Sequence, residues 1–234
     1  MSGAMFSNFD FDVIRRALPY LFYEGMTFTL TLTALAAFGG LAFGTLLALM
    51  RLSGLKLLAR VAGLYVDLMR SLPLVLVIFW FYFLVPYIGQ WLTDAARPIH
   101  VGAFASSLIT FIMFEAAYFS EIMRAGIQSI SKGQPAAAQA LGLTYSQTMR
   151  YVVLPQAFRN MLPVLLTQTI VLFQDTSLVY VLSISDFLGA ASKVAQRDGR
   201  LVEMYLFAAL VYFTISCVAS FGVRRLQARI AVVR

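Results

Sequence analysis

Two carboxylates lie inside stretches of this sequence that are otherwise apolar. Glu115 falls in one such run and Asp175 in another. An ionisable side chain at membrane depth is energetically costly, so it indicates a functional role by default. Such groups can bind a polar solute and pass it between helices, which is transport chemistry and breaks no covalent bond. We predict a translocation path lined by Glu115, Gln168, Gln174, Asp175, Thr176 and Ser177.

The spacing of these residues supports a path and leaves a second interpretation open. Gln168 and Asp175 are seven residues apart, so on a helix they face a common direction. Gln174 and Ser177 are three apart and form a second polar strip beside the first. Polar side chains in membrane helices also hydrogen-bond across helix interfaces. A pure packing role for Glu115 and Asp175 is therefore the alternative.

The sequence has little material for catalysis. It holds one histidine, His100, in a predicted loop, and one cysteine, Cys217, in an apolar run. It also lacks the G-x-x-x-x-G-K-S/T loop that cradles nucleotide phosphates. A membrane-embedded enzyme would need a cluster of histidines, cysteines or acids at one depth. We therefore predict a non-catalytic chain with no metal or cofactor of its own, driven by the energy of a partner.

The elements that must position these residues are transmembrane helices. Hydrophobic residues make up 60% of the sequence and charged residues 12%, with a mean hydropathy of +0.80; soluble domains are roughly half apolar and about a quarter charged. In a bilayer each segment satisfies its own backbone polar groups, so we expect an all-α polytopic fold. Runs near the length that crosses the hydrocarbon core occupy residues 26–50, 72–87, 101–123, 161–182 and 203–223.

Basic residues are divided unequally between the two sides of these spans. Twelve lysines and arginines lie on one side, including Arg70 just before the second span, and six on the other. The positive-inside rule puts the richer side in the cytoplasm, and hence the N-terminus outside. The net charge of +7 is then an orientation signal and indicates no nucleic-acid partner. The predicted parts are an extracytoplasmic amphipathic segment (1–25), a transmembrane domain (26–223) and a cytoplasmic tail (224–234).

The N-terminal segment carries apolar residues at helical spacing, with Arg15 and Arg16 on another face: Ile14, Ala17, Leu18, Leu21 and Phe22. We expect a helix that lies along the outer membrane surface. It serves either as a membrane anchor or as a contact for an extracytoplasmic partner. In the first span, Gly40 and Gly44 are spaced for close helix packing, either within the chain or against a neighbouring subunit.

The stretch 133–155 joins the third and fourth spans on the predicted cytoplasmic side. Its landmarks are Ala136, Ala137, Ala138, Gly142, Leu154 and Pro155. Small residues let a short helix lie flush in a partner's groove. Gly142 would end that helix, because glycine adopts the left-handed C-cap conformation without a steric penalty. Pro155 is expected to stop the local fold before the next span. We predict that these residues couple the chain to a cytoplasmic partner.

This order resembles the EAA loop of ABC importer permeases, which inserts a short coupling helix into a groove on a cytoplasmic ATPase. The family's glutamate would fall at position 136, where this sequence has Ala136. The literal Glu-Ala-Ala string that begins at Glu115 is a different feature, because it lies inside an apolar run and Glu121 stands where the loop needs its glycine. The spacing of the glycine and the proline carries the assignment.

The resemblance extends to the polar amino-acid ABC permeases, and among them to glutamate/aspartate permease subunits. The matching landmarks are Leu18-Pro19, Gly25-Met26-Thr27, Arg70-Ser71-Leu72-Pro73, Arg124-Ala125-Gly126-Ile127 and residues 173–182. It implies the type I importer permease fold in a bacterial inner membrane, surrounded by lipid. It also implies a second homologous permease, a periplasmic amino-acid-binding protein and an ABC ATPase dimer that binds ATP and Mg²⁺.

Glutamate or aspartate is the substrate that this resemblance implies. The residues themselves do not favour it: an anionic substrate suits an intramembrane Arg or Lys, and we find none in the middle of a predicted span. Glu115 and Asp175 carry the opposite sign. A basic or neutral polar amino acid (histidine, lysine, arginine or glutamine) stays open as an alternative. A secondary transporter or channel is a more remote one, since these usually show repeated halves and need no docking loop.

Overall fold

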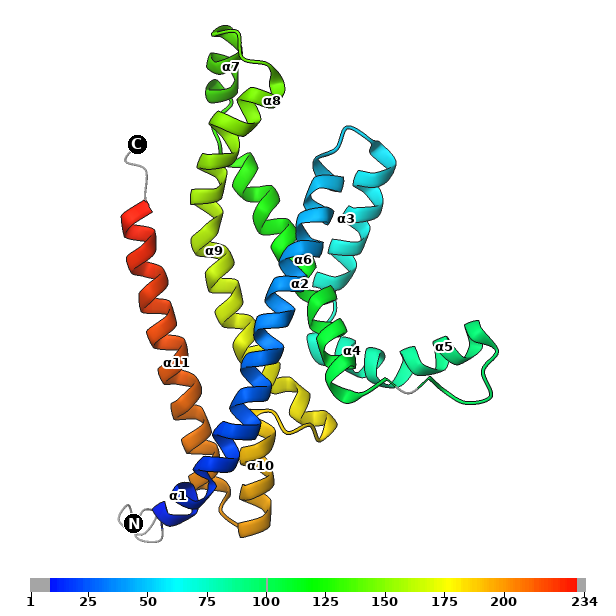
Figure 1. The fold of residues 1–234 in the computed structure, drawn as a ribbon, viewed down its shortest axis with the longest axis vertical. Helices are drawn as coiled ribbons and strands as arrows, with labels where there is room; N and C mark the ends of the chain where they lie inside the picture. The colour runs from blue at the N-terminus through cyan, green and yellow to red at the C-terminus, as the bar shows by residue number, and fades with distance from the viewer. Residues whose placement is uncertain (1–8, 100, 231–234) are drawn as a thin grey trace.

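The chain folds into helices arranged along one long axis (Figure 1). The computed structural model describes residues 9–99 and 101–230, and this part of the chain contains helices and connecting loops but no β-strand. His100 and the outermost residues of the predicted N-terminal segment and C-terminal tail lie outside it. Five segments are long and apolar enough to cross a membrane: Phe11–Leu52, Leu74–Thr93, Ala103–Gln128, Tyr145–Leu182 and Leu201–Ile230. The predicted all-α fold with about five spans is confirmed.

The first span is one continuous helix with a bend near its start (Figure 1). It consists of α1 (Phe11–Tyr20), the π-helical turn η1 (Leu21–Met26) and α2 (Thr27–Leu52). Asp10 begins the helix, because its carboxylate accepts two backbone N–H groups of the first turn. Pro19 has no N–H to donate, and the chain changes to π geometry directly after it.

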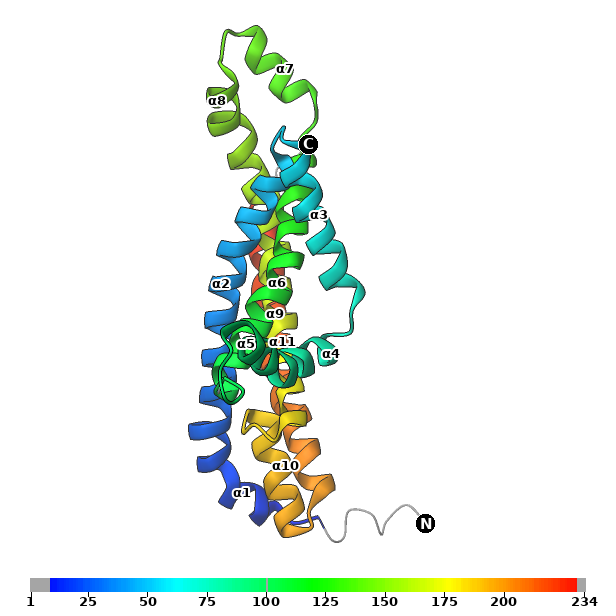
Figure 2. The ribbon, with the colours of Figure 1, turned by 90° about the vertical axis from the view of Figure 1, so that its right-hand side faces the viewer.

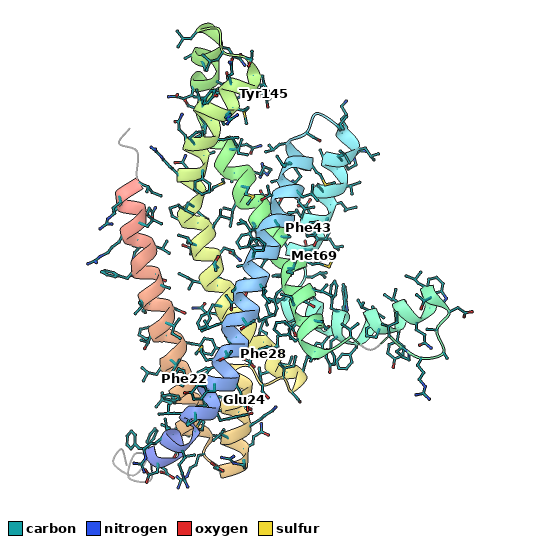
Figure 3. The ribbon with its side chains drawn as sticks, in the orientation of Figure 1. Phe22, Glu24, Phe28, Phe43, Met69 and Tyr145 are labelled. Atoms are coloured by element: carbon teal, nitrogen blue, oxygen red, sulfur yellow. The ribbon has the colours of Figure 1, made fainter. Side chains whose placement is uncertain are left out.

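The apolar face of α1 packs against protein, whereas the sequence predicted a helix on the membrane surface. Val13, Ala17 and Leu21 are buried against α10 (Phe187–Asp198) and α11 (Leu201–Ile230). The segment after the fourth span, too short for a core of its own, forms α10 and joins this shared core. On the predicted apolar face, Leu18 of α1 and Phe22 of η1 stay partly exposed; Phe22 is labelled in Figure 3.

The most extensive helix contact joins α2 to α6 (Ala103–Gln128). A Cβ added at Gly44 would lie 2.9 Å from the carbonyl oxygen of Ala116, and one at Gly40 would lie 3.0 Å from the Cβ of Glu115. The glycines thus let two helices approach closely, as small residues do in membrane bundles. The predicted close contact is therefore made within this chain, and it holds Glu115 against α2.

Replacing Gly44 with leucine should strongly reduce the yield of folded protein. The obstacle is backbone, which cannot rotate aside, and overpacking a well-packed site typically costs about 1–3 kcal/mol. Fluorescence-detected size-exclusion chromatography after mild heating measures the loss. Gly63→Leu is the matched control, because a Cβ at Gly63 meets nothing within 4 Å. Equal recovery of both variants would contradict close α2–α6 packing.

The second span follows a different path from the predicted one. After α2, α3 (Lys56–Ser71) returns antiparallel beside it and packs Ala62 and Val66 in a cluster with α2 and α6 (Figures 1 and 2). The chain then turns across the long axis through α4 (Leu74–Phe79), η2 (Trp80–Leu84) and α5 (Val85–Thr93). α5 projects sideways in Figure 1 and is seen end-on in Figure 2. The apolar run expected over 72–87 is helical and extends to Thr93, but it lies across the long axis of the molecule.

Local chemistry explains this difference. Pro86 has no N–H for a helical bond to the preceding turn, so the helix shifts to π geometry over η2 before it. Arg60, Asp67 and Arg70 make the 56–71 segment too polar to be recognised as part of a span. Its buried face is nevertheless apolar, and this face decides its position against α2.

The fourth span begins earlier than predicted. α7 (Gly133–Ala140) is followed by a continuous helical stretch: α8 (Tyr145–Thr148), η3 (Met149–Val153), α9 (Leu154–Asp175) and η4 (Thr176–Leu182). α7 and α8 project at one end of the molecule, which we call the loop end (Figure 1). α1 and α10 lie at the opposite end. The loop end and the opposite end are thus separated by the full length of α2 and α9.

Candidate functional site

The short helix predicted in the docking loop is α7, and it ends at Gly142 as predicted. Gly142 has a φ of +87°, and its N–H donates to the carbonyl of Gln139 at 2.9 Å. The N–H of Leu143 donates to the carbonyl of Ala138 at 3.1 Å. This pair of bonds is the Schellman motif, which needs a left-handed residue after the helix. Thr144 then begins α8 with a capping box. The loop is a fixed helix–turn–helix.

α7 presents small residues to its surroundings. Ala136 and Ala137 are exposed, whereas Ala138 is buried and packs inward. Leu141 and Tyr145 flank the turn with 82% and 72% of their surface exposed, and Tyr145 is labelled at the loop end in Figure 3. Exposed apolar side chains around a flat face of alanines are typical of a surface that docks on another protein.

Leu154 and Pro155 lie in the first turn of α9, so Pro155 does not stop the local fold as the sequence suggested. Proline suits a first turn because that position has no helical N–H bond to lose. The π turn η3 runs directly into it. The loop therefore continues without a break into the helix that carries Gln168 and Asp175.

Glu115 is completely buried where α2, α6 and α9 meet. The side-chain amide nitrogen of Gln168 donates to both of its carboxylate oxygens, at 3.3 and 3.2 Å. The structure thus brings together two of the predicted path residues. In this arrangement their bond joins α6 to α9, as the packing interpretation expects, and the path interpretation stays a prediction.

The other predicted path residues divide between packing and exposure. The amide of Gln174 donates to Ser216 of α11 at 2.9 Å, and the hydroxyl of the buried Thr176 donates to the carbonyl of Phe173 at 2.7 Å. Both contacts fix the junction between α9 and η4. Asp175 and Ser177 are half-buried at this junction. Within the described chain, the Asp175 carboxylate accepts no hydrogen bond and forms no ion pair. Asp175 is thus the charged path residue for which the described chain provides no partner.

A cation that the sequence placed in a loop lies against α6, the helix that carries Glu115. Arg70 is near the end of α3, and its guanidinium carbon is 5.5 Å from the centre of the Tyr118 ring on α6. Arg70, Glu115 and Asp175 all lie close enough to the Tyr118 hydroxyl to act on it electrostatically. The return of α3 beside α2 brings Arg70 there. If Arg70 is left out of the count, eleven lysines and arginines lie on the predicted cytoplasmic side and six on the other. The orientation argument is unchanged.

A further buried acid, Asp186, is accounted for by the fold. Its carboxylate caps α10, accepting the N–H groups of Leu188 and Gly189 at 3.0 Å each. Burial raises the pKa of Asp186 to about 6, and these hydrogen bonds lower it in part. The N–H of Phe187 donates to Thr29 of α2 at 3.0 Å. Asp186 therefore caps α10, and the neighbouring Phe187 joins α10 to α2 at the end opposite the loop.

Comparison with known proteins identifies relatives over nearly the whole chain. Residues 40–232 match the model of the family described as binding-protein-dependent transport system inner membrane component. The glutamate/aspartate import permease protein GltK of Escherichia coli O6:H1 is 52% identical over 96% of this chain and 99% of its own length. The glutamine transport system permease protein GlnP of Escherichia coli K12 is 33% identical over 96% of this chain and 99% of its own length.

A solved structure agrees with the fold described above. The crystal structure of an amino acid ABC transporter with histidines contains a chain that superposes with a TM-score of 0.85 at 32% identity, covering 94% of this chain and 98% of that one.

Proposed function

Because this chain belongs to the family of binding-protein-dependent transport system inner membrane components, we propose that it is the membrane-spanning permease subunit of an ATP-driven amino-acid importer. Its own role is to form the translocation path and to undergo the conformational change that the ATPase drives. It performs no catalysis itself. The observation that carries the proposal is the docking loop: an ordered α7 with exposed alanines, ended by Gly142 and continuous with α9.

The partners follow from this role. A cytoplasmic ABC ATPase dimer, which binds ATP and Mg²⁺, would receive α7. A second homologous permease would complete the path, because the polar groups around Tyr118 lie in one subunit and a path needs opposing walls. A periplasmic amino-acid-binding protein would deliver substrate at the end formed by α1 and α10. The excess of basic residues supports a cytoplasmic loop end and a periplasmic N-terminus in a bacterial inner membrane.

Glutamate or aspartate is the proposed substrate. The support is the 52% identity to a glutamate/aspartate permease, against 33% to a glutamine permease. A basic or neutral polar amino acid is the second candidate, and the specific observation that favours it is the pair of acids Glu115 and Asp175 near the proposed path.

One experiment tests the function and the substrate together. The protein is purified from its native membrane, its companions are identified, and the complex is reconstituted with the binding protein. We expect an ATPase and a second permease to co-purify. ATP-dependent glutamate uptake should compete with aspartate more strongly than with glutamine or arginine. Uptake without ATP would indicate a channel or secondary transporter, and preferential uptake of arginine would reject the acidic substrate.

A smaller effect is expected at position 136, where this chain has alanine in place of the family's glutamate. Ala136 is exposed on α7, so docking here would depend on shape more than on an ion pair at this position. Ala136→Glu should then change the coupled ATPase rate by less than about twofold, since exposed ion pairs contribute roughly 0–1 kcal/mol. ATPase assays in the reconstituted complex measure it, with Ala138→Glu as the contrast, because Ala138 is buried. A severalfold rise with Ala136→Glu would show that the carboxylate matters.

A further inference from the structure

An apolar groove of about 680 Å³ lies between α2, α6 and α9. The three helices meet at Glu115 and separate from one another towards the loop end (Figure 1), and the groove fills the space between them. Among the described residues, Thr45 and Thr169 are its only polar lining side chains, and their hydroxyls donate to carbonyls of their own helices at 2.7 and 3.0 Å. A molecule that fills this groove must therefore be apolar.

The groove is as long as one leaflet of a bilayer. Leu154 and Thr169, its outermost lining residues on α9, are fifteen residues apart, which is about 22 Å at about 1.5 Å per residue. A bilayer with its headgroups is about 40–45 Å thick, so one leaflet takes up roughly half of that. A helix of a second permease would cross both leaflets, whereas this groove ends where Glu115 holds the three helices together. Its length fits a lipid chain of the leaflet at the loop end.

The mouth of the groove at the loop end is cationic. Residues 122–174 contain four basic residues and no acidic one. The nearest acid towards the N-terminus, Glu121, is already paired with Arg51 of α2 and with Arg124. Basic clusters between membrane helices on the cytoplasmic side bind the headgroups of anionic lipids. The charge at this mouth therefore selects an anionic headgroup.

Arg159 is the basic residue best placed to contact that headgroup. It is exposed, and within the described part of the chain it forms no ion pair. It precedes Leu162 by three residues and Leu166 by seven, so it shares a face of α9 with these two lining residues. It also directly follows Phe158, which lines the mouth. A cation thus lies at the end of an apolar face, which is the pattern that a phospholipid needs.

We propose that this groove binds an acyl chain of an anionic phospholipid from the cytoplasmic leaflet, with the lipid phosphate beside Arg159. The inference rests on the proposed cytoplasmic location of the loop end. The bound chain fills the space between α2 and α9 and so stabilises their separation. Since α9 continues directly from the docking loop, the lipid is a ligand of the helix that is attached to this loop.

A photo-crosslinker in the groove identifies its occupant. Phe38 lines the groove and is 77% exposed, so it is replaced by benzoylphenylalanine in the complete complex. The complex is purified in a detergent that removes loosely held lipid, and it is irradiated with phosphatidylglycerol added in trace amounts. We expect this chain to gain the mass of one phospholipid. The matched control is Leu46→benzoylphenylalanine, an exposed position of α2 outside the groove, which should gain none.

Two results would overturn the inference. An adduct between Phe38→benzoylphenylalanine and a second permease would show that protein fills the groove. Equal phospholipid adducts at positions 38 and 46 would show that the groove holds lipid no better than the rest of the surface. Neither measurement depends on transport, so a complex that takes up no amino acid can still support the lipid site, and the two proposals fail separately.

Variants in the crosslinking background test the acyl chain and the headgroup one at a time. Leu162→Trp fills the groove and should lower the adduct roughly tenfold, because about two methylene groups lost from an apolar site have that effect. Val164→Trp, exposed and outside the groove, should leave it unchanged. Arg159→Gln should lower the preference for phosphatidylglycerol over phosphatidylethanolamine roughly fivefold, as expected for one basic residue at an anionic headgroup. Arg60→Gln, exposed on α3, is its control. Equal adducts in both tryptophan variants would reject the acyl chain, and an unchanged preference in Arg159→Gln would reject the phosphate contact.

Discussion

Replacing Gly142 with aspartate should abolish uptake while the protein still inserts and folds. The φ of +87° at this position suits glycine, and a non-glycine residue there costs on the order of 1–3 kcal/mol. The strain falls on the Schellman turn, so α7 would lose its fixed end and its orientation to α8. The new carboxylate would also stand beside Leu141, in the surface that the ATPase groove is proposed to cover. Uptake by reconstituted complexes and the amount of membrane-inserted protein are measured together.

A matched control separates the turn from the added charge. A Cβ at Gly54 meets nothing within 4 Å, and Gly54 does not have a left-handed φ. It lies in the short connection between α2 and α3, towards the same end of the molecule, so Gly54→Asp should leave uptake near the wild-type level. Gly142→Ala should fall between the two, because it keeps the strain and omits the charge. Normal uptake by a well-expressed Gly142→Asp variant would remove the main support for coupling through α7.

The docking loop could be predicted from sequence because its signals are local. A glycine that must be left-handed, a run of alanines before it and a proline at fixed spacing each restrict only a few neighbouring residues. The structure bears out the helix end at Gly142. The predicted stop at Pro155 is not observed. The π turn η3 comes before this proline, and the helix continues through it into α9.

The position of Arg70 could not be predicted from sequence because it depends on a long-range contact. A hydropathy reading assigns polar residues 56–71 to a loop, and only the packing of Ala62 and Val66 against α2 and α6 returns them to the bundle. The same limit applies to Gln174. Its spacing matched Ser177, but its partner is Ser216, which is forty-two residues away. Local periodicity gives a direction on one helix and does not say which helix lies there.

Replacing Asp175 with asparagine should change transport more than stability. A carboxylate that is unpaired in a dry interface costs several kcal/mol, and one that faces a water-filled path costs far less. Asp175 is half-buried and accepts no hydrogen bond within the described chain, so removing its charge releases no partner. We therefore expect uptake to fall roughly tenfold or to shift towards another substrate. The melting temperature of the complex should change by no more than a few degrees, as for substitutions outside a packed network.

Gln174→Leu provides the opposite case on the adjacent residue. Gln174 donates to Ser216 and so holds α9 to α11, and its loss leaves that hydroxyl unsatisfied beside an apolar side chain. We expect lower thermal stability with little change in transport per assembled complex. Thermal stability and uptake are measured on the same reconstituted complex for each variant, with glutamate, aspartate, glutamine and arginine as competitors. If Asp175→Asn instead lowers stability while transport per complex stays constant, Asp175 packs helices.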